Sequence, residues 1–210
     1  FRVSLKPWKA MKKTKVVDKD KQPMLMSHHT DAEGFYVFDR GKIGTGQGQA
    51  FLGAGFNFSR GSGSSVYGSR NIQAYLDARK PLRSDRNTLS IYQIDQIIKE
   101  LNAINGDNIE YNFADNISRA ARAIYEYGGD LDTYASLCTA YYGETRDVLE
   151  VFEKLGFDST IEYGDDKRIM NVVVFNSHQI KSADPVTYDD NGNVIPLSER
   201  FNLKEEDIRF

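Results

Sequence analysis

Glycine is concentrated in one stretch of the chain, where nine residues between 41 and 68 are Gly. Glycine weakens helices and tolerates positive φ, so this stretch predicts turns and strands, or a ligand that the backbone approaches closely. The surrounding residues 14–83 agree, because they lack helical periodicity and alternate Gly/Ser stretches with short apolar segments at 15–17, 23–26, 35–38, 55–58 and 72–76. We expect strands and long loops here, although 61–68 alone is equally typical of a flexible surface loop.

A helical pattern takes over in a block at 84–156. Residues 90–103 have isoleucines at helical spacing, and Ser90 with Gln93 forms a capping-box pattern. Further helices are expected at 116–127, 131–142 and 145–155, the last ended by Gly156.

Strands return after the helical block, at 160–163 and 170–175. The run Val172-Val173-Val174 predicts a strand buried on both faces, and Asp190 to Gly192 predicts a turn within a polar tail, 184–210. The whole chain, 1–210, is thus expected to be one α+β domain, with a basic segment at 1–14 and the helical block inserted before the last strands.

Composition excludes several classes of protein. With 27 Lys+Arg against 30 Asp+Glu the net charge is −3, which argues against nucleic-acid binding through bulk charge, although the lysine-rich residues 1–22 leave a local basic patch open. The single Cys138 excludes an internal disulfide, and one cysteine with three histidines does not suit a structural zinc site. No stretch approaches the roughly 18 apolar residues that cross a membrane. Because the chain begins at Phe1, we expect a piece of a larger protein.

Familiar catalytic motifs are also absent. There is no P-loop, no dinucleotide-binding G-x-G-x-x-G, no H-E-x-x-H and no G-x-S-x-G. The features that remain are His28-His29-Thr30 after an apolar strand, the Gly-rich run 53–59, Tyr67, and Gln179 at the end of the last buried strand. Taken singly, each is also explained by a turn or by packing.

In order along the chain, these features resemble the ADP-ribosyltransferase domain of phage and mobile-element polyvalent proteins. That family reads Tyr-His-Gly-Thr, then Gly-x-Gly-φ-Tyr-Phe-Ser, then Gln-Ile-Lys-Ser. The matching segments here are Ser27 to Thr30, Gly53 to Ser59 and Gln179 to Ser182, followed by a typical tail over 184–201. The resemblance runs from about residue 15 to the C-terminus and is thinnest over 84–147.

The resemblance implies a fold in which two antiparallel sheets form a cleft for NAD, the substrate, without a metal. His28 would bind ribose hydroxyls, the backbone of His29 would hold the nicotinamide carboxamide, and Thr30 would support the strand end. Tyr67 would stack on the nicotinamide ring, and Gln179 would orient the ribose 2′-hydroxyl; its neutral amide favours mono- over poly-ADP-ribosylation. The rest of the NAD site would be Gly55, Asn57, Phe58 and Ser59.

The chain departs from the family at three positions: Ser27 and Asn57 replace Tyr, and His29 replaces Gly. Asn57 removes stacking area from the nicotinamide slot, so three hypotheses stay open. The first is a mono-ADP-ribosyltransferase, acting as an effector or toxin in a bacterial cytoplasm. Its acceptor would be a macromolecule, with protein favoured over nucleic acid, and an immunity protein is a further candidate partner. The second is an NAD glycohydrolase, and the third is a catalytically decayed module that binds NAD, nucleic acid or a partner protein. Residues 40–49 and the helical block would select the acceptor, and surface arginines are a further option for the NAD phosphates, at Arg70, Arg79 and Arg83.

Overall fold

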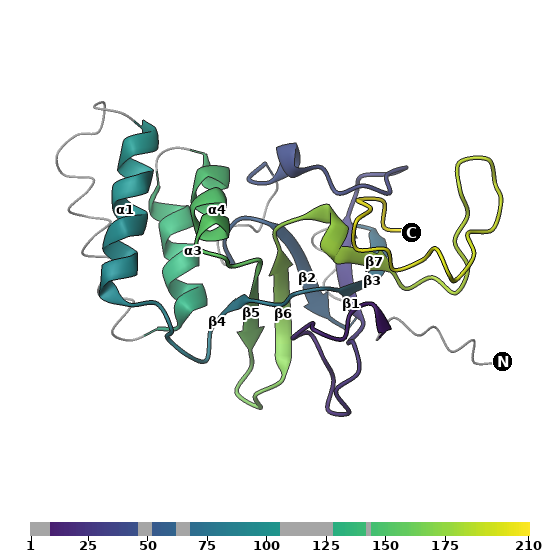
Figure 1. Ribbon diagram of the computed structural model, residues 1–210, viewed down its shortest axis with the longest axis horizontal. Helices are drawn as coiled ribbons and strands as arrows, with labels where there is room; N and C mark the ends of the chain where they lie inside the picture. The colour runs from purple at the N-terminus through teal and green to yellow at the C-terminus, as the bar shows by residue number, and fades with distance from the viewer. Residues whose placement is uncertain (1–8, 46–51, 62–67, 106–127, 142–143) are drawn as a thin grey trace.

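The computed structural model describes residues 9–45, 52–61, 68–105, 128–141 and 144–210 (Figure 1). Its strands form one seven-stranded mixed sheet in the order β4-β5-β6-β2-β1-β3-β7, with the helices at one end of the molecule. The strands are β1 (Met26–Thr30), β2 (Phe56–Arg60), β3 (Arg70–Leu76), β4 (Pro81–Arg83), β5 (Ser159–Tyr163), β6 (Ile169–Val174) and β7 (Ile180–Ser182). The described helices are α1 (Ile91–Asn105), α3 (Asp130–Ala140) and α4 (Thr145–Lys154), with short 3-10 helices η2 (Arg40–Lys42) and η5 (Ser177–Gln179).

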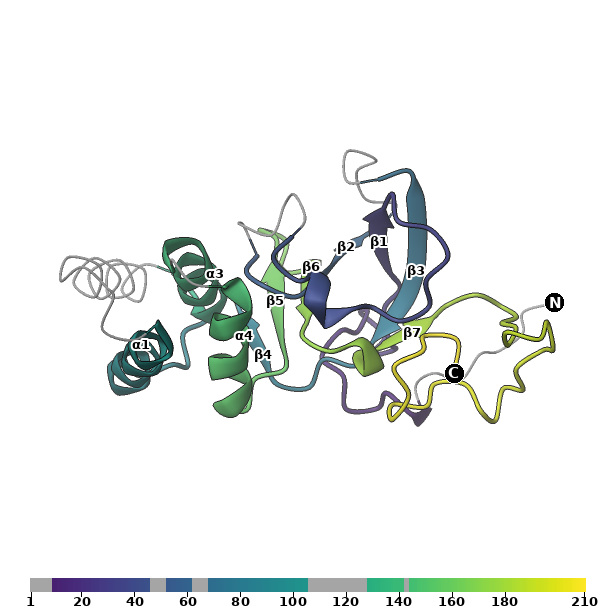
Figure 2. The same cartoon turned by 90° about the horizontal axis from the view of Figure 1, so that it is seen from above.

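The sheet divides into two groups of strands, β4-β5-β6-β2 and β1-β3-β7, which are joined only by a short ladder between β1 and β2. β1 pairs with β2 through Met26 and Ser27 alone, whereas it pairs with β3 along its whole length. β2 in turn pairs with β6 from Phe56 to Ser59. The expected two separate sheets are therefore one curled sheet in the described chain, and its β4–β5 pair is parallel (Figure 2).

The inner face of the curl is apolar and aromatic. Phe56 and Phe58 of β2 share this face with His28 of β1, because every second residue of a strand points the same way. The segment 31–45 crosses the curl and places the Phe38 ring 5.2 Å from Phe56 and 5.7 Å from Phe58 (Figure 2). The predicted strand at 35–38 is wrong: Val37 makes one isolated bridge, with Asp207, and the neighbouring Phe38 packs into the curl instead.

Most of the other expected elements are present. The capping box of α1 is confirmed, since the Ser90 N–H donates to Gln93 Oε1 at 2.9 Å and the Gln93 N–H donates to Ser90 Oγ at 3.2 Å. Val172, Val173 and Val174 are each 0% exposed, which confirms a strand buried on both faces. The predicted helix at 116–127 lies outside the described residues. Among the described helices, none has the length and apolar character to cross a membrane.

Gly53, which lies just before β2, lets α3 pack closely against this end of the strand. Its φ is +80°, and a Cβ there would lie 2.3 Å from Cε1 of Tyr134 on α3. The Tyr134 hydroxyl donates to the carbonyl of Ala54 at 2.7 Å, so ring and backbone fit closely together. The glycine therefore decides how near α3 can approach the sheet.

We predict that Gly53→Ala is markedly less stable than Gly61→Ala. Both glycines have φ +80°, so both variants carry the same left-handed strain of about 1–2 kcal/mol, but a Cβ at Gly61 meets nothing within 4 Å. The clash with Tyr134 adds about 1–3 kcal/mol of overpacking. Urea unfolding of the two variants measures the difference, and equal midpoints would contradict this account of Gly53.

Candidate functional site

His28 bridges the place where β1 and β2 stop pairing. Its Nδ1 lies 2.8 Å from the carbonyl oxygen of Asn57. A carbonyl only accepts, so Nδ1 carries the proton, and the neutral ring keeps a lone pair on Nε2, which bonds to none of the described residues. Burial lowers the pKa of His28 below 6.5, partly offset by the Asn57 carbonyl. Near pH 7 the side chain is therefore a neutral hydrogen-bond acceptor.

Two aromatic rings enclose the His28 imidazole. Its centroid lies 5.0 Å from the ring of Phe38, edge to face, and 5.3 Å from the ring of Phe58. The sequence predicted Phe58 as a site residue but missed Phe38. The sequence feature that could have indicated Phe38 is the short aromatic run 35–38. This run also contains Phe35, whose ring lies 5.2 Å from that of Phe38.

His29 and Asn57 lie on the opposite face of the sheet from His28. His29 Nδ1 lies 3.3 Å from the carbonyl of Gly68, and its buried Nε2 has no partner among the described residues. Asn57 Nδ2 donates to the Gly55 carbonyl at 3.4 Å, and its buried Oδ1 is likewise unpartnered. Two acceptors without donors therefore share one face, while His28 and Phe58 share the other.

Three more of the predicted residues shape the backbone here. Thr30 Oγ1 accepts from the Ala32 N–H at 3.1 Å and so caps the end of β1. Gly55 has φ +140°, and a Cβ there would lie 2.3 Å from a methyl group of Val173 on β6. Ser59 Oγ lies 3.5 Å from the Ser27 carbonyl. Tyr67 lies outside the described residues, so its stacking role stays a prediction.

Gln179 is not where the sequence placed it. It lies in η5 rather than at the end of a strand, and only 3% of it is exposed. Its Oε1 accepts from the N–H groups of Phe175 (3.1 Å) and Asn176 (2.9 Å), and its Nε2 donates to the carbonyls of Asp77 (2.9 Å) and Asp158 (3.1 Å). A side-chain amide has two N–H donors and two acceptor lone pairs, and all four are used. The prediction that Gln179 contacts a ribose hydroxyl is therefore wrong, because the amide has no donor or acceptor left for that contact.

A charged network joins η2 to α4 next to Asn176, the residue that precedes η5. Arg40 Nη2 donates to Glu153 Oε2 at 2.9 Å, and Asn176 Nδ2 donates to Glu153 Oε1 at 2.6 Å. The Glu153 carboxylate raises the pKa of Arg40, so the pair is charged. Sequence patterns gave no signal for this network, since its members are far apart in the chain.

The comparisons with known proteins give the family. A family model described as ADP-ribosyltransferase in polyvalent proteins matches residues 18–189. The chain belongs to this family. The match confirms the resemblance in the sequence and assigns the chain to ADP-ribosylation as a general activity. No curated protein and no solved structure matches the chain. Within the described residues of this ADP-ribosyltransferase domain, no group of His, Cys, Asp or Glu is arranged to hold a metal ion.

We predict that Gln179→Glu is strongly destabilised. The carboxylate would face the carbonyls of Asp77 and Asp158 where the amide now donates, and an uncompensated buried charge costs about 3–5 kcal/mol. Burial raises the pKa of such a carboxyl above its unfolded value, so the deficit in unfolding free energy grows as pH rises above about 4.3 and shrinks as pH falls. Urea unfolding at several pH values measures it.

Gln73→Glu is the matched control, because Gln73 is exposed on β3 and the chemical change is the same. We expect it to stay within about 0.5 kcal/mol of wild type. A Gln179→Glu variant as stable as Gln73→Glu would show that the amide is free to contact a ligand.

Proposed function

We propose that this domain is a mono-ADP-ribosyltransferase that binds NAD beside His28, where β1 and β2 stop pairing (the opening between β1 and β2). The observation that carries the proposal is the acceptor lone pair of His28 at this opening, in a chain of this family. Rings of Phe38 and Phe58 hold the imidazole in place, so the acceptor is preorganised.

The chemistry requires groups that hold the ribose while the bond to nicotinamide breaks. The ribose develops an oxocarbenium-like charge, as in glycoside hydrolysis. Nε2 of His28 would accept a hydrogen bond from a ribose hydroxyl and fix the sugar as the charge develops. The nicotinamide carboxamide is proposed to bind the backbone of His29, because the side chains of His29 and Asn57 lie on the opposite face of the sheet from His28.

Gln179 acts on the site from a distance in this proposal. Its four hydrogen bonds fix the segments after β3, before β5 and after β6. It is therefore a positioning residue. Single rather than repeated transfer stays a prediction, which rests on the neutral amide that the sequence has at position 179.

The acceptor of the ADP-ribose is proposed to be a macromolecule. The effector or toxin role, the bacterial cytoplasm as the place of action and an immunity protein as partner all stay predictions, with protein as the first acceptor class to test. The family description, which places such domains in polyvalent proteins, is what supports delivery within a larger chain.

We predict that His28→Ala loses transfer while His178→Ala keeps it. Loss of one preorganised hydrogen bond at the reacting sugar lowers the rate about 100-fold or more. His178 is the same residue type on η5, outside the opening. Both variants and wild type are incubated with NAD labelled on its adenosine side in bacterial lysate, and free nicotinamide and labelled macromolecule are followed together.

The products separate the three hypotheses. Label on protease-sensitive material that disappears only in His28→Ala supports the transferase. Nicotinamide release without labelled macromolecule would make the domain an NAD hydrolase instead. If neither product forms with wild type, the chain is a binding module, and isothermal titration with NAD then shows whether NAD is its ligand.

The pH profile tests the state of His28. Protonation of Nε2 removes the acceptor, and burial holds the pKa of this group below its ordinary 6.5. We therefore expect the acid limb of kcat/KM for NAD to have its midpoint below pH 6.5, the ordinary pKa of histidine. An acid limb at or above pH 6.5 that is absent from His28→Ala would contradict a buried, neutral His28.

A further inference from the structure

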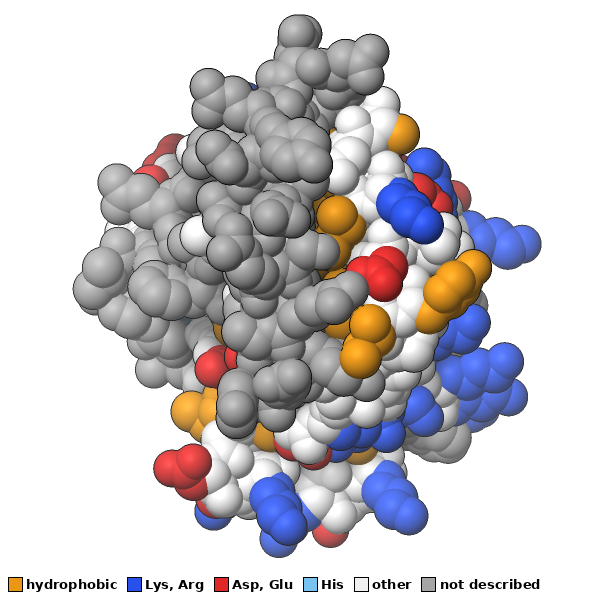
Figure 3. Space-filling model, turned by 90° about the vertical axis from the view of Figure 1, so that its left-hand side faces the viewer, with side chains coloured by type: hydrophobic (Ala, Val, Ile, Leu, Met, Phe, Trp, Pro, Cys, Tyr) orange, Lys and Arg blue, Asp and Glu red, His pale blue; other side chains and the backbone are white. Residues whose placement is uncertain are grey.

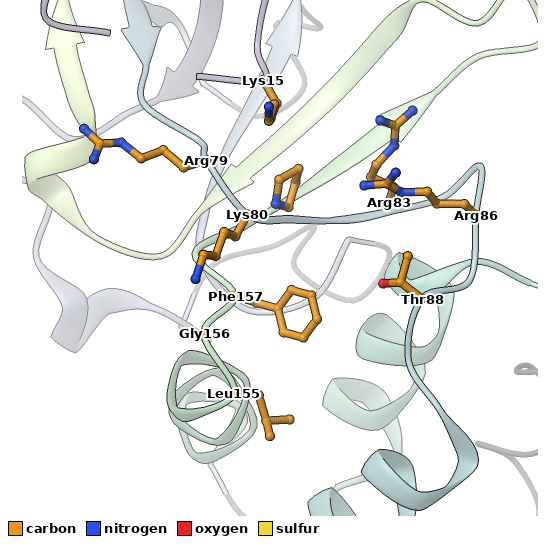
Figure 4. Close-up of a pocket in the computed structure, with 10 residues that line it drawn as sticks. Lys15, Arg79, Lys80, Arg83, Arg86, Thr88, Leu155, Gly156 and Phe157 are labelled. Carbon is orange, nitrogen blue, oxygen red and sulfur yellow. The ribbon is translucent and has the colours of Figure 1, made fainter. Parts of the chain in front are cut away.

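A cavity lies away from the opening between β1 and β2. Its volume is about 440 Å³, and it is bounded by β4, the segments on either side of β4, and the end of α4 (Figure 4). His28 pairs with Ile72 in the middle of β3, whereas the cavity begins past Leu76, the last residue of that strand. This part of β3 alone spans ~13 Å, so the cavity is separate from the proposed NAD site.

The lining of the cavity is strongly cationic. No Asp or Glu is among the described residues that line it, and five lining residues are basic: Lys15, Arg79, Lys80, Arg83 and Arg86. Arg79 pairs with Asp77 and Arg83 with Asp85, at 2.8 and 2.7 Å. Lys15, Lys80 and Arg86 take part in none of the ion pairs of the described chain. The side chains of these three cations therefore make no direct ion pair, although the carboxylates of Asp85 and Asp158 lie beside Arg86 and Lys80.

The backbone beside these cations is held firmly. The carboxylate of Asp158 accepts from the N–H groups of Arg79 and Lys80 at 3.0 and 2.9 Å, and from the hydroxyl of Ser159. The Lys15 N–H donates to the carbonyl of Ala78 at 2.6 Å. The cations thus stand on a preorganised frame, which lowers the entropy lost when they bind an anion.

The arrangement suits a strand of phosphates better than a single one. Residues 79–83 reach up to ~14 Å in extended form, so the basic residues along them can contact more than one phosphate. Lysines at 12, 13, 19 and 21, near Lys15 in the sequence, are exposed as well, together with Asp18 and Asp20. Figure 3 shows Lys and Arg side chains gathered along one edge of the face at the helical end of the molecule.

The cavity also holds an aromatic ring. Phe157 lies between Lys80 on one side and Thr88 with Arg86 on the other, while Arg79 points away from the ring (Figure 4). A base stacked on an aromatic side chain gains about 1–3 kcal/mol whatever its identity, and cations along the backbone supply the rest of the affinity. An acidic polypeptide has carboxylates but no flat bases to use this ring.

We propose that this cavity binds the phosphate backbone of a single-stranded nucleic acid, with a base against Phe157. Lys15, Lys80 and Arg86 contact phosphates. The site works whether or not the domain transfers ADP-ribose, since none of these residues belongs to the opening between β1 and β2.

The test measures binding of a labelled single-stranded oligonucleotide of about 12 nucleotides by fluorescence anisotropy. We expect Lys80→Glu and Arg86→Glu each to weaken binding about ten-fold at low salt and to make the salt dependence shallower by about one contact. Lys204→Glu makes the same charge change on an exposed residue of the C-terminal segment that does not line the cavity, and His28→Ala changes the proposed NAD site. Both should bind as wild type does, and circular dichroism confirms that all four variants are folded.

Three outcomes overturn the proposal. The first is no binding by wild type at about 50 mM salt, and the second is equal affinity in the Lys80, Arg86 and Lys204 variants. The third is competition by poly-glutamate as effective as competition by unlabelled oligonucleotide of equal charge, which would assign the surface to an acidic protein segment. None of these outcomes bears on NAD turnover, so the proposed transferase stands or fails separately.

Discussion

The buried amide of Gln179 holds the two groups of strands in register. It bonds to the chain after β6, to Asp77 after β3 and to Asp158 before β5, and the Gln179 carbonyl accepts from the Asp77 N–H at 2.8 Å. Because the chain passes from one strand group to the other at Asp77, these bonds set the curl of the sheet. Hydrogen bonds in so buried a place cannot be replaced by water, so the loss of one leaves an unsatisfied group.

The rest of the Gln-Ile-Lys-Ser motif has a similar role. Lys181 is 0% exposed, and its ammonium donates to the carbonyls of Glu205 and Asp207 at 2.7 and 3.2 Å. Burial lowers the pKa of this lysine to about 8. The Ser182 N–H donates to the Ile208 carbonyl at 2.7 Å, so the motif holds the C-terminal segment against β7. A motif can therefore identify a family correctly while its residues act on the frame of the site rather than on the substrate.

Local patterns predicted the elements whose stability is local. The isoleucine spacing and the Ser90–Gln93 pair were enough for α1, and the valine run was enough for β6, because burial on both faces needs an unbroken apolar strand. β4 and β7 were missed because three residues give no periodicity, and each exists only through pairing with a distant strand. The same limit explains the site. The sequence placed His28 just after an apolar strand at 23–26, whereas it lies within β1. The divergence of β1 from β2, the ring of Phe38 and the enclosure of Gln179 depend on long-range packing.

The order of the strands along the chain also controls when the site can form. β1 and β2 are complete by residue 60, yet β2 pairs with β6, which begins at Ile169, and β3 pairs with β7, which begins at Ile180. Pairings so distant in sequence cannot form until a ribosome has made β6 and β7, and they fold slowly afterwards. A chain that ends before β6 therefore has His28 but not the sheet around it. The strand order makes this sheet one of the last parts of the domain to assemble during synthesis.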